Sequence, residues 1–125
     1  MRFIDSNILA YAFYENENRE RCINIVKEGG IIDSLCLIEA FNIIENETRK
    51  RDIAVEAIKS LMKINLEIVN VDSNVVFEAL KKAEKYKKLK FLDLIHYIIA
   101  LNYECKEILS YDKDFNDLEI KKTEP

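Results

Sequence analysis

Apolar and polar residues alternate along the chain in blocks of two lengths. Short blocks rich in Ile, Leu and Val, bounded by polar residues or glycine, are typical of buried strands. These blocks lie at 2–5, 30–33, 66–71 and 107–110, and the segment 118–122 predicts a last edge strand. Between them lie longer blocks whose apolar positions recur with the spacing of a helix.

The longer blocks predict six helices. Their spans run from Ser6 or Asn7 to Tyr14, over 17–28, about 35–47 and about 53–64, from 73 to about 87, and over about 91–104. Ser34, Asp52 and either Asp72 or Ser73 stand before three of these helices, where a short polar side chain accepts hydrogen bonds from free backbone amides. A glycine pair after residue 28 ends the second helix.

Short apolar strands separated by helices predict a mainly parallel sheet covered by helices on both faces, a three-layer α/β/α sandwich. The 125 residues fit one domain, 1–125, with one packed core, and two glycines and one proline leave no flexible linker. In such sheets, ligands bind beyond the carboxyl ends of the strands. Side chains that follow strand ends are therefore the candidates for a functional site.

Composition narrows the class of protein. The net charge of −4 argues against a surface that binds nucleic acid as a whole, although it allows a local basic patch. The apolar runs are too short to cross a bilayer, and the N-terminus lacks the pattern of a secretory signal. Three widely spaced cysteines without a C-x-x-C pair predict buried, reduced thiols. We expect a cytoplasmic protein without a membrane segment.

Acidic residues interrupt three apolar runs. They are Asp5 in FIDSNIL, Glu39 in SLCLIEAFNII and Asp93 in FLDLIHYIIAL, and a fourth, Asp112, follows the strand at 107–110. Singly, most are explained as a cap, a turn residue or a complement to a helix dipole. Together they form a set of carboxylates that repel one another unless a cation joins them.

Oxygen ligands of this kind suit Mg²⁺ or Mn²⁺, which can polarise a phosphoryl oxygen and activate a bound water. The chain has a single histidine, so no Cys/His cluster is predicted as a transition-metal site. That histidine, His96, and Tyr97 follow Asp93 by three and four residues on one row of the helix. For His96 we expect packing at the cleft or a dimer contact rather than catalysis.

The order and spacing of the acids resemble the four acidic motifs of the PIN domain family, in particular small prokaryotic toxins of the VapC type. FIDSNIL, SLCLIEAFNII, FLDLIHYIIAL and ILSYDKDF carry the resemblance, which extends from residue 3 to Phe115. It implies a PIN-like α/β/α fold and an endoribonuclease that depends on Mg²⁺ or Mn²⁺. It also implies a homodimer and, for a toxin, an antitoxin partner.

The resemblance implies the following site residues. Asp5, Glu39 and Asp93 would be metal ligands and catalytic residues, Asp112 would complete the set, and Asp114 is a possible substitute for Asp112. Ser6 and Asn7 match the small polar positions after the first acid, and Ser110 matches a Ser or Thr that commonly precedes the fourth.

Two basic segments adjoin these acids. KKAEKYKKLK at 81–90 contains six lysines and one tyrosine, and TRKR at 48–51 follows the helix of Glu39. Lysine and arginine neutralise phosphates, and an aromatic ring can stack on a single-stranded base. The predicted RNA contacts are Lys85, Lys87, Lys88, Arg49 and Arg51. The alternative for each is a solvated helix face.

Other functions remain open beside an RNA-cleaving toxin. A PIN-like nuclease that cuts DNA, an RNA-processing factor and a PIN scaffold that binds partners without cutting all fit the same residues. A haloacid dehalogenase-type phosphohydrolase needs D-x-D after its first strand, where this chain has D-S-N. A receiver-like signalling module needs an acidic pair near that strand and a late lysine, and nucleotide-cofactor binding lacks a glycine-rich phosphate loop.

Overall fold

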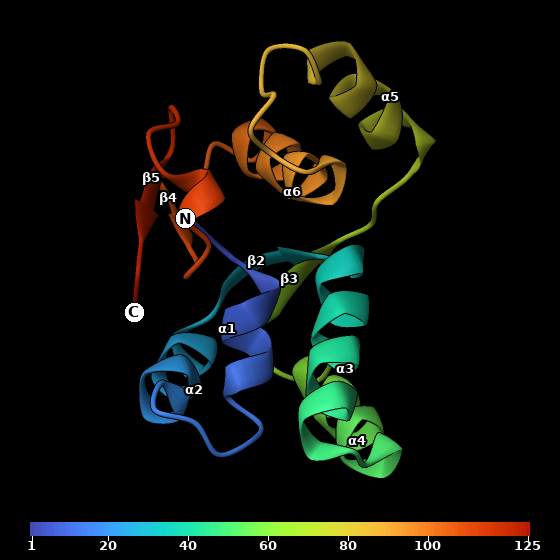
Figure 1. Ribbon diagram of the computed structural model, residues 1–125, viewed down its shortest axis with the longest axis vertical. Helices are drawn as coiled ribbons and strands as arrows, with labels where there is room; N and C mark the ends of the chain where they lie inside the picture. Colours follow the sequence, from blue (N-terminus) through green and yellow to red (C-terminus); the bar gives the residue numbers. More distant parts are fainter.

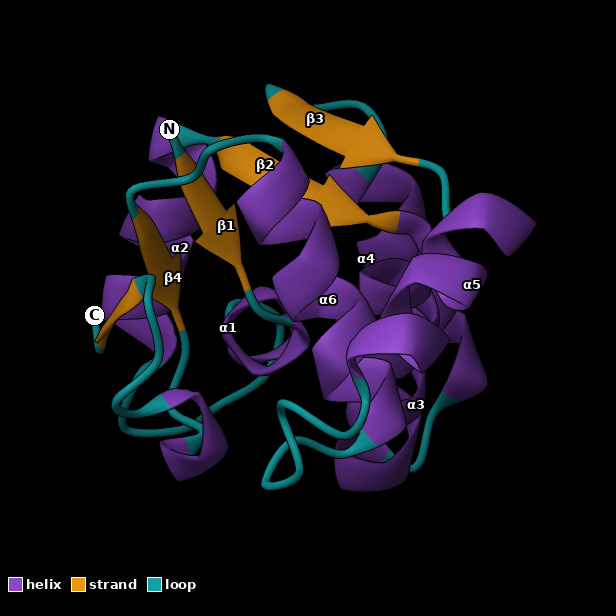
Figure 2. Ribbon diagram, turned by 90° about the horizontal axis from the view of Figure 1, so that it is seen from above, coloured by secondary structure: helices purple, strands orange, loops and turns teal.

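A five-stranded sheet, parallel throughout, forms the centre of the computed structural model, which describes residues 1–125. Its strand order is β3-β2-β1-β4-β5 (Figure 2). The strands are β1 (Arg2–Ile4), β2 (Gly30–Asp33), β3 (Leu66–Val69), β4 (Glu107–Leu109) and β5 (Lys121–Thr123). In register, Phe3 of β1 stands between Ile31 of β2 and Ile108 of β4. The predicted parallel sheet is confirmed.

Helices cover both faces of the sheet. They are α1 (Ser6–Tyr11), α2 (Arg19–Glu28), α3 (Ser34–Thr48), α4 (Arg51–Leu61), α5 (Ser73–Lys82) and α6 (Phe91–Asn102), with a short 3₁₀ helix, η1 (Lys113–Phe115). In Figure 1, α1 to α4 lie below the sheet and α5 and α6 lie above it. The predicted three-layer α/β/α sandwich is confirmed. None of these helices is both long and apolar enough to cross a membrane.

The residues predicted to cap helices differ from the structure in three places. Asp5, not Ser6 or Asn7, caps α1, and Asp33, not Ser34, caps α3. In both cases an acid at or just after the end of a strand accepts hydrogen bonds from the backbone amides that follow, which joins strand and helix with no loop between them. The helix expected after Asp52 begins one residue before it, at Arg51, without a side-chain cap.

Several helices are shorter than predicted, and for two of them the contacts show why. The first ends at Tyr11 rather than Tyr14, because the Asn16 side-chain amide donates to the carbonyl oxygens of both residues and closes a turn. The fifth ends at Lys82 rather than about Lys87. Tyr86 is buried there, and its hydroxyl donates to Glu119 at 2.6 Å, which favours a series of turns over a continued helix.

The parallel sheet brings several chain segments to one edge. β1, β2 and β4 run in the same direction, so Asp5, Asp33 and Ser110 all lie at or just past carboxyl ends of neighbouring strands. All three side chains are buried. α6, which carries Asp93 and His96, packs against β2 on the face of the sheet opposite α1 to α4 (Figure 1).

Candidate metal centre

A cavity of about 270 Å³ opens at this edge of the sheet. Its lining combines acids with small polar and apolar residues: Asp5, Ser6, Asn7, Glu39, Ile43, Lys90, Leu92, Asp93 and Asp112. The structure therefore brings four of the acids selected from the sequence into one cavity, together with Ser6 and Asn7. Asp114 does not line it.

Asp5 lines the cavity and is 4% exposed. Its Oδ1 accepts from the Ser6 amide at 2.8 Å, and its Oδ2 accepts from Ser110 Oγ at 2.5 Å. Burial raises the pKa of the Asp5 carboxyl, while the hydrogen bond from Ser110 acts in the opposite direction. Asp5 interrupts the apolar run because the strand ends at Ile4 and the next residue must cap a helix.

Glu39 reaches the cavity from the second turn of α3, with its side chain 25% exposed. Its Oε1 lies 2.6 Å from Nε2 of His96, so a hydrogen bond inside the protein holds one of its two carboxylate oxygens. Glu39 differs in this from the capping acids, because it satisfies no backbone amide. Its position in the middle of an apolar helix segment is therefore explained by this cavity.

Asp93 lies in the first turn of α6, half-buried, and no protein group donates a hydrogen bond to its carboxylate. Partial burial, followed by repulsion from Asp5 and Asp112, raises the pKa of Asp93 to about 6. A cation bound among the three carboxylates would reverse this shift, because it favours their ionised forms.

Asp112 and Asp114 follow β4 on a tight turn. Asp112 caps η1, because its Oδ1 accepts from the Asp114 amide at 2.9 Å, and its own amide donates to Ser110 Oγ at 2.9 Å. Ligand oxygens of Asp93, Asp112 and Asp114 lie within 4.8 Å of one another. Asp112 faces the cavity and Asp114 stands beside it, which favours Asp112 as the fourth acid.

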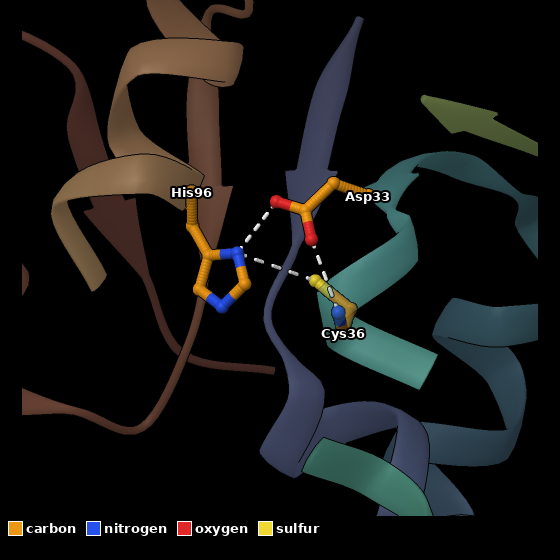
Figure 3. Close-up of side chains that lie close together, drawn as sticks. All are labelled: Asp33, Cys36 and His96. Carbon is orange, nitrogen blue, oxygen red and sulfur yellow. Dashed lines mark hydrogen bonds and ion pairs between the residues drawn. The ribbon is translucent and has the colours of Figure 1, made fainter. Parts of the chain in front are cut away.

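Asp33, Cys36 and His96 form a buried cluster behind Glu39 that the sequence did not predict (Figure 3). His96 Nδ1 lies 2.5 Å from Asp33 Oδ2 and 3.7 Å from Cys36 Sγ, and Asp33 Oδ1 accepts from the Cys36 amide at 3.0 Å. The expectation of a His96 dimer contact is wrong, since the side chain is fully buried. Tyr97 lies away from the cavity, and its hydroxyl accepts from the Ile120 amide.

The charge of this cluster follows from its contacts. Burial alone would lower the pKa of His96, but Cys36, Asp33 and Glu39 raise it well above its usual range. Burial raises the pKa of the Cys36 thiol to about 12, so the thiol is neutral near pH 7. Asp33 and Glu39 are the two carboxylates that face the His96 ring, one at each nitrogen.

The residues of the cavity fit a divalent cation with oxygen ligands. They supply several carboxylates whose mutual repulsion a cation would relieve. Asn7, which also lines the cavity, has a buried Oδ1 atom without a hydrogen-bond partner. An amide oxygen can coordinate Mg²⁺ or Mn²⁺ directly, or accept a hydrogen bond from a water bound to the ion.

The predicted RNA contacts lie outside the cavity. Lys85 lies over the ring of Tyr86, Lys87 pairs with Glu84, and Lys88 donates to a backbone carbonyl. All three lysines are exposed on the segment that leads to Lys90, the one lysine that lines the cavity.

The arginines lie at the other end of α3. Arg49 stands ten residues beyond Glu39, about 15 Å along the helix axis. Arg51 pairs with Glu45 at 2.5 Å and lies over the Phe41 ring. Contact between these arginines and RNA bound at the cavity would therefore require a substrate that extends along α3.

Comparison with known proteins relates the whole chain to one group. A family model described as PIN domain matches residues 2–121. No protein in a curated set matches. Among solved structures, the sarcin-ricin loop cleaving toxin VapC20 of Mycobacterium tuberculosis has a TM-score of 0.85 at 13% identity, with both chains covered completely.

Two further structures are toxin–antitoxin assemblies. A toxin–antitoxin complex from Klebsiella pneumoniae has a TM-score of 0.72 at 18% identity, over 98% of this chain and 97% of the other. VapBC2 of Rickettsia felis, bound to a fragment of promoter DNA, has a TM-score of 0.68 at 15% identity, with the same coverage. At these identities the likeness is one of fold.

Proposed function

Since the chain belongs to the PIN domain family, we propose that it is a metal-dependent endoribonuclease and the toxin of a type II toxin–antitoxin pair. One observation carries this proposal. Four carboxylates from four separate segments line one cavity at the carboxyl edge of a parallel sheet, where such folds bind ligands. The toxins of similar fold, one of them described as cleaving the sarcin-ricin loop, support RNA as the substrate.

The acids have the following roles in this proposal. Asp5, Glu39, Asp93 and Asp112 would hold Mg²⁺ or Mn²⁺ and are the catalytic residues, with Asp114 as the substitute for Asp112. The ion would supply Lewis acidity at the phosphodiester and lower the pKa of a bound water.

Three polar side chains complete the cavity in this proposal. Ser110 orients Asp5 through the hydrogen bond at 2.5 Å and also accepts from the Asp112 amide. Ser6, whose amide donates to Asp5, fixes the other oxygen of that carboxylate. Asn7 presents an amide oxygen without a protein partner, which leaves it free to hold a water or the substrate.

The first test is cleavage of a labelled single-stranded RNA with Mn²⁺ or Mg²⁺, beside a DNA strand of matched sequence. Cutting of RNA that EDTA and Asp93→Asn both abolish would support the proposal. Asp52→Asn is the matched control, because Asp52 is an exposed acid outside the cavity. Preferred cutting of DNA would favour a DNA nuclease instead. Metal binding without cutting of either strand would favour an RNA-processing factor with a strict substrate. If the protein binds no metal, a PIN scaffold without catalytic activity would be favoured.

RNA binding would use the lysines of the segment before α6. Lys85, Lys87 and Lys88 are exposed, and Lys90 leads from them into the cavity. Replacement of the first three by Glu should weaken binding of single-stranded RNA and lower the salt slope of log K by about 2, at roughly 0.7 per lost phosphate contact. Lys27, Lys59 and Lys63, exposed elsewhere, provide the control triple. Unchanged affinity at low salt would remove these lysines from the RNA-binding surface.

Two protein partners belong to the proposal. The assemblies of similar fold from Klebsiella pneumoniae and Rickettsia felis support an antitoxin. A homodimer is supported by large apolar side chains left in solvent, since Ile38 of α3 and Phe77 and Leu80 of α5 are each more than half exposed. We place the protein in the cytoplasm, where its RNA and an antitoxin would both be met.

A further inference from the structure

Behind Glu39 lies a continuous path of hydrogen bonds that ends on a strand of the sheet. Asp33, the last residue of β2, accepts from the Cys36 amide with one oxygen and faces His96 Nδ1 at 2.5 Å with the other. The opposite nitrogen of the ring lies 2.6 Å from Glu39 Oε1. Asp33 and His96 are 0% exposed, so water cannot replace either contact.

We propose that Asp33 and His96 are positioning residues that hold Glu39 in the orientation required to bind the metal ion. This inference rests on the proposed metal-dependent function. A free glutamate on a helix has several rotamers, and ordering such a side chain costs conformational entropy. A contact to Oε1 removes this freedom before the ion arrives and leaves Oε2 without a protein partner, so that it can bind the ion.

The two contacts together fix the orientation of the His96 ring. Both ring nitrogens face carboxylate oxygens at hydrogen-bonding distance, Nδ1 on Asp33 and Nε2 on Glu39. A rotation of the ring would therefore break the contact with Asp33, and this contact holds Nε2 in the place from which it faces Glu39 Oε1.

Two other readings of the cluster fit less well. Stabilisation of the core alone does not require a histidine between two acids, because apolar residues of similar size often serve as well or better. A zinc ion held by Asp33, Cys36 and His96 would separate its ligand atoms by about 3.3 Å or more, given metal–ligand bonds of about 2.0 Å or longer in a tetrahedron. The Asp33–His96 separation of 2.5 Å is that of a hydrogen bond.

The test is calorimetric binding of Mn²⁺ to the RNA-free protein with two substitutions of the same residue. In His96→Gln the side-chain amide reaches roughly the place of Nε2 and can still donate to Glu39, whereas in His96→Asn it reaches only the place of Nδ1 and Asp33. Loss of a group that orients a metal ligand weakens affinity about 10–100-fold, which we expect for His96→Asn. For His96→Gln we expect a change within about threefold. Equal affinities in the two variants would overturn the proposal.

A double-mutant cycle separates this inference from the proposed metal centre. Glu39→Gln should itself weaken Mn²⁺ binding, and His96→Asn should add no further loss in that background, because His96 acts through Glu39. A further loss would overturn the positioning role. If Glu39→Gln binds Mn²⁺ as tightly as the native protein, Glu39 is not a ligand and the proposed metal centre is what fails.

Two more variants complete the test. Asp33→Asn keeps an oxygen for the Cys36 amide and carries the test if the His96 variants do not fold. We expect Mn²⁺ affinity to fall roughly fivefold, because the carboxylate oxygen that fixes the His96 ring through Nδ1 is lost, and an unchanged affinity would overturn the role of Asp33. Cys36→Ser should leave Mn²⁺ affinity unchanged. One bound zinc per chain that Cys36→Ser abolishes would assign the cluster to a metal and overturn the proposal.

Discussion

The two walls of the cavity are built differently. Asp5 and Glu39 stand on one side, each held from behind by a buried donor, Ser110 for one and His96 for the other. Asp93, on the other side, receives no hydrogen bond, and its pKa is raised to about 6 by partial burial and by repulsion from Asp5 and Asp112. Hydrogen bonds within the protein therefore hold Asp5 and Glu39 in place without a cation, whereas no protein group donates a hydrogen bond to Asp93.

The difference follows from the elements that supply each wall. Asp5 is attached to a central strand, and Ser110 extends the neighbouring strand, so the sheet sets the geometry of that side. Asp93 belongs to the first turn of a helix that packs on the opposite face. We call the side with Asp5 and Glu39 the rigid wall and the side with Asp93 and Asp112 the strained wall. A cation in the cavity would bind between the two.

The largest expected effect is that of Asp93→Asn. Mn²⁺ affinity should fall about 1,000-fold, or roughly 4 kcal/mol, because one charged ligand is lost. The metal-free protein should nevertheless unfold at a higher temperature, since the substitution removes a half-buried charge that repels its neighbours. Calorimetry and thermal unfolding measure the two quantities, with Asp52→Asn as the control. A less stable metal-free variant would show that Asp93 supports the fold and would remove the contrast between the walls.

Asp112 and Asp114 both lie close to Asp93, and their substitution tests which of the two is the fourth acid of the site. Asp112→Asn should weaken Mn²⁺ binding about 100-fold, because Asp112 lines the cavity. Its cap on η1 survives, since asparagine also accepts from the Asp114 amide. Asp114→Asn should weaken Mn²⁺ binding by about fivefold or less, because it removes a nearby negative charge but no metal ligand. The reverse order of the two losses, measured by the same titration, would identify Asp114 as the fourth acid.

The strands and the acids are the parts of this molecule that the sequence predicts best, for a physical reason. Buried parallel strands are continuous apolar runs, and a lone carboxylate such as Glu39 or Asp93 stands out in an apolar segment because burying it is costly. The resemblance to the PIN domain family then predicts that these acids belong to one site. Asp5 and Glu39 could thus be selected although 34 residues separate them.

Asp33 and His96 could not be found in this way. Asp33 ends a strand just before a helix, a position that a capping role already explains. Its contact with His96 joins residues 63 positions apart and depends on how α6 is rotated over β2, which helical spacing alone does not determine. The early end of α5 was missed for a similar reason, because Tyr86 contacts Glu119, which is distant in the sequence.

Ser110 tests the rigid wall. Ser110→Ala removes the donor to Asp5 Oδ2 and the acceptor of the Asp112 amide, both in a buried setting. We expect about 2 kcal/mol lower stability and roughly tenfold weaker Mn²⁺ binding. Ser6→Ala is the matched control, because the Ser6 hydroxyl lies at a long 3.4 Å from Asp5 and its amide contact survives. Equal effects of the two substitutions would mean that Ser110 does not orient Asp5.

The smallest expected effect is a pH dependence of the metal-free protein. The folded-state pKa of Asp93 is about 6 and its ordinary value 3.8, so the folded chain binds the extra proton between these values and stability rises as pH falls through about 6. Asp5 and His96, whose pKa values are also raised, shift stability in the same direction. Comparison with Asp93→Asn cancels their contribution as long as they titrate alike in both proteins.

That comparison isolates the strained wall. At about pH 7.5, Asp93→Asn should be more stable than the native protein by about 1 kcal/mol, well below the full free energy of the shift because the half-buried carboxylate retains part of its hydration. The gap should close near pH 5, where Asp93 is protonated in the folded state, and thermal unfolding at both pH values measures it. Mn²⁺ at a concentration that saturates the native protein but not the variant should reverse its sign at pH 7.5, because the native protein then gains more stability from the ion. A gap that stays constant with pH would mean that Asp93 is not strained without the cation, and the two walls would then be alike.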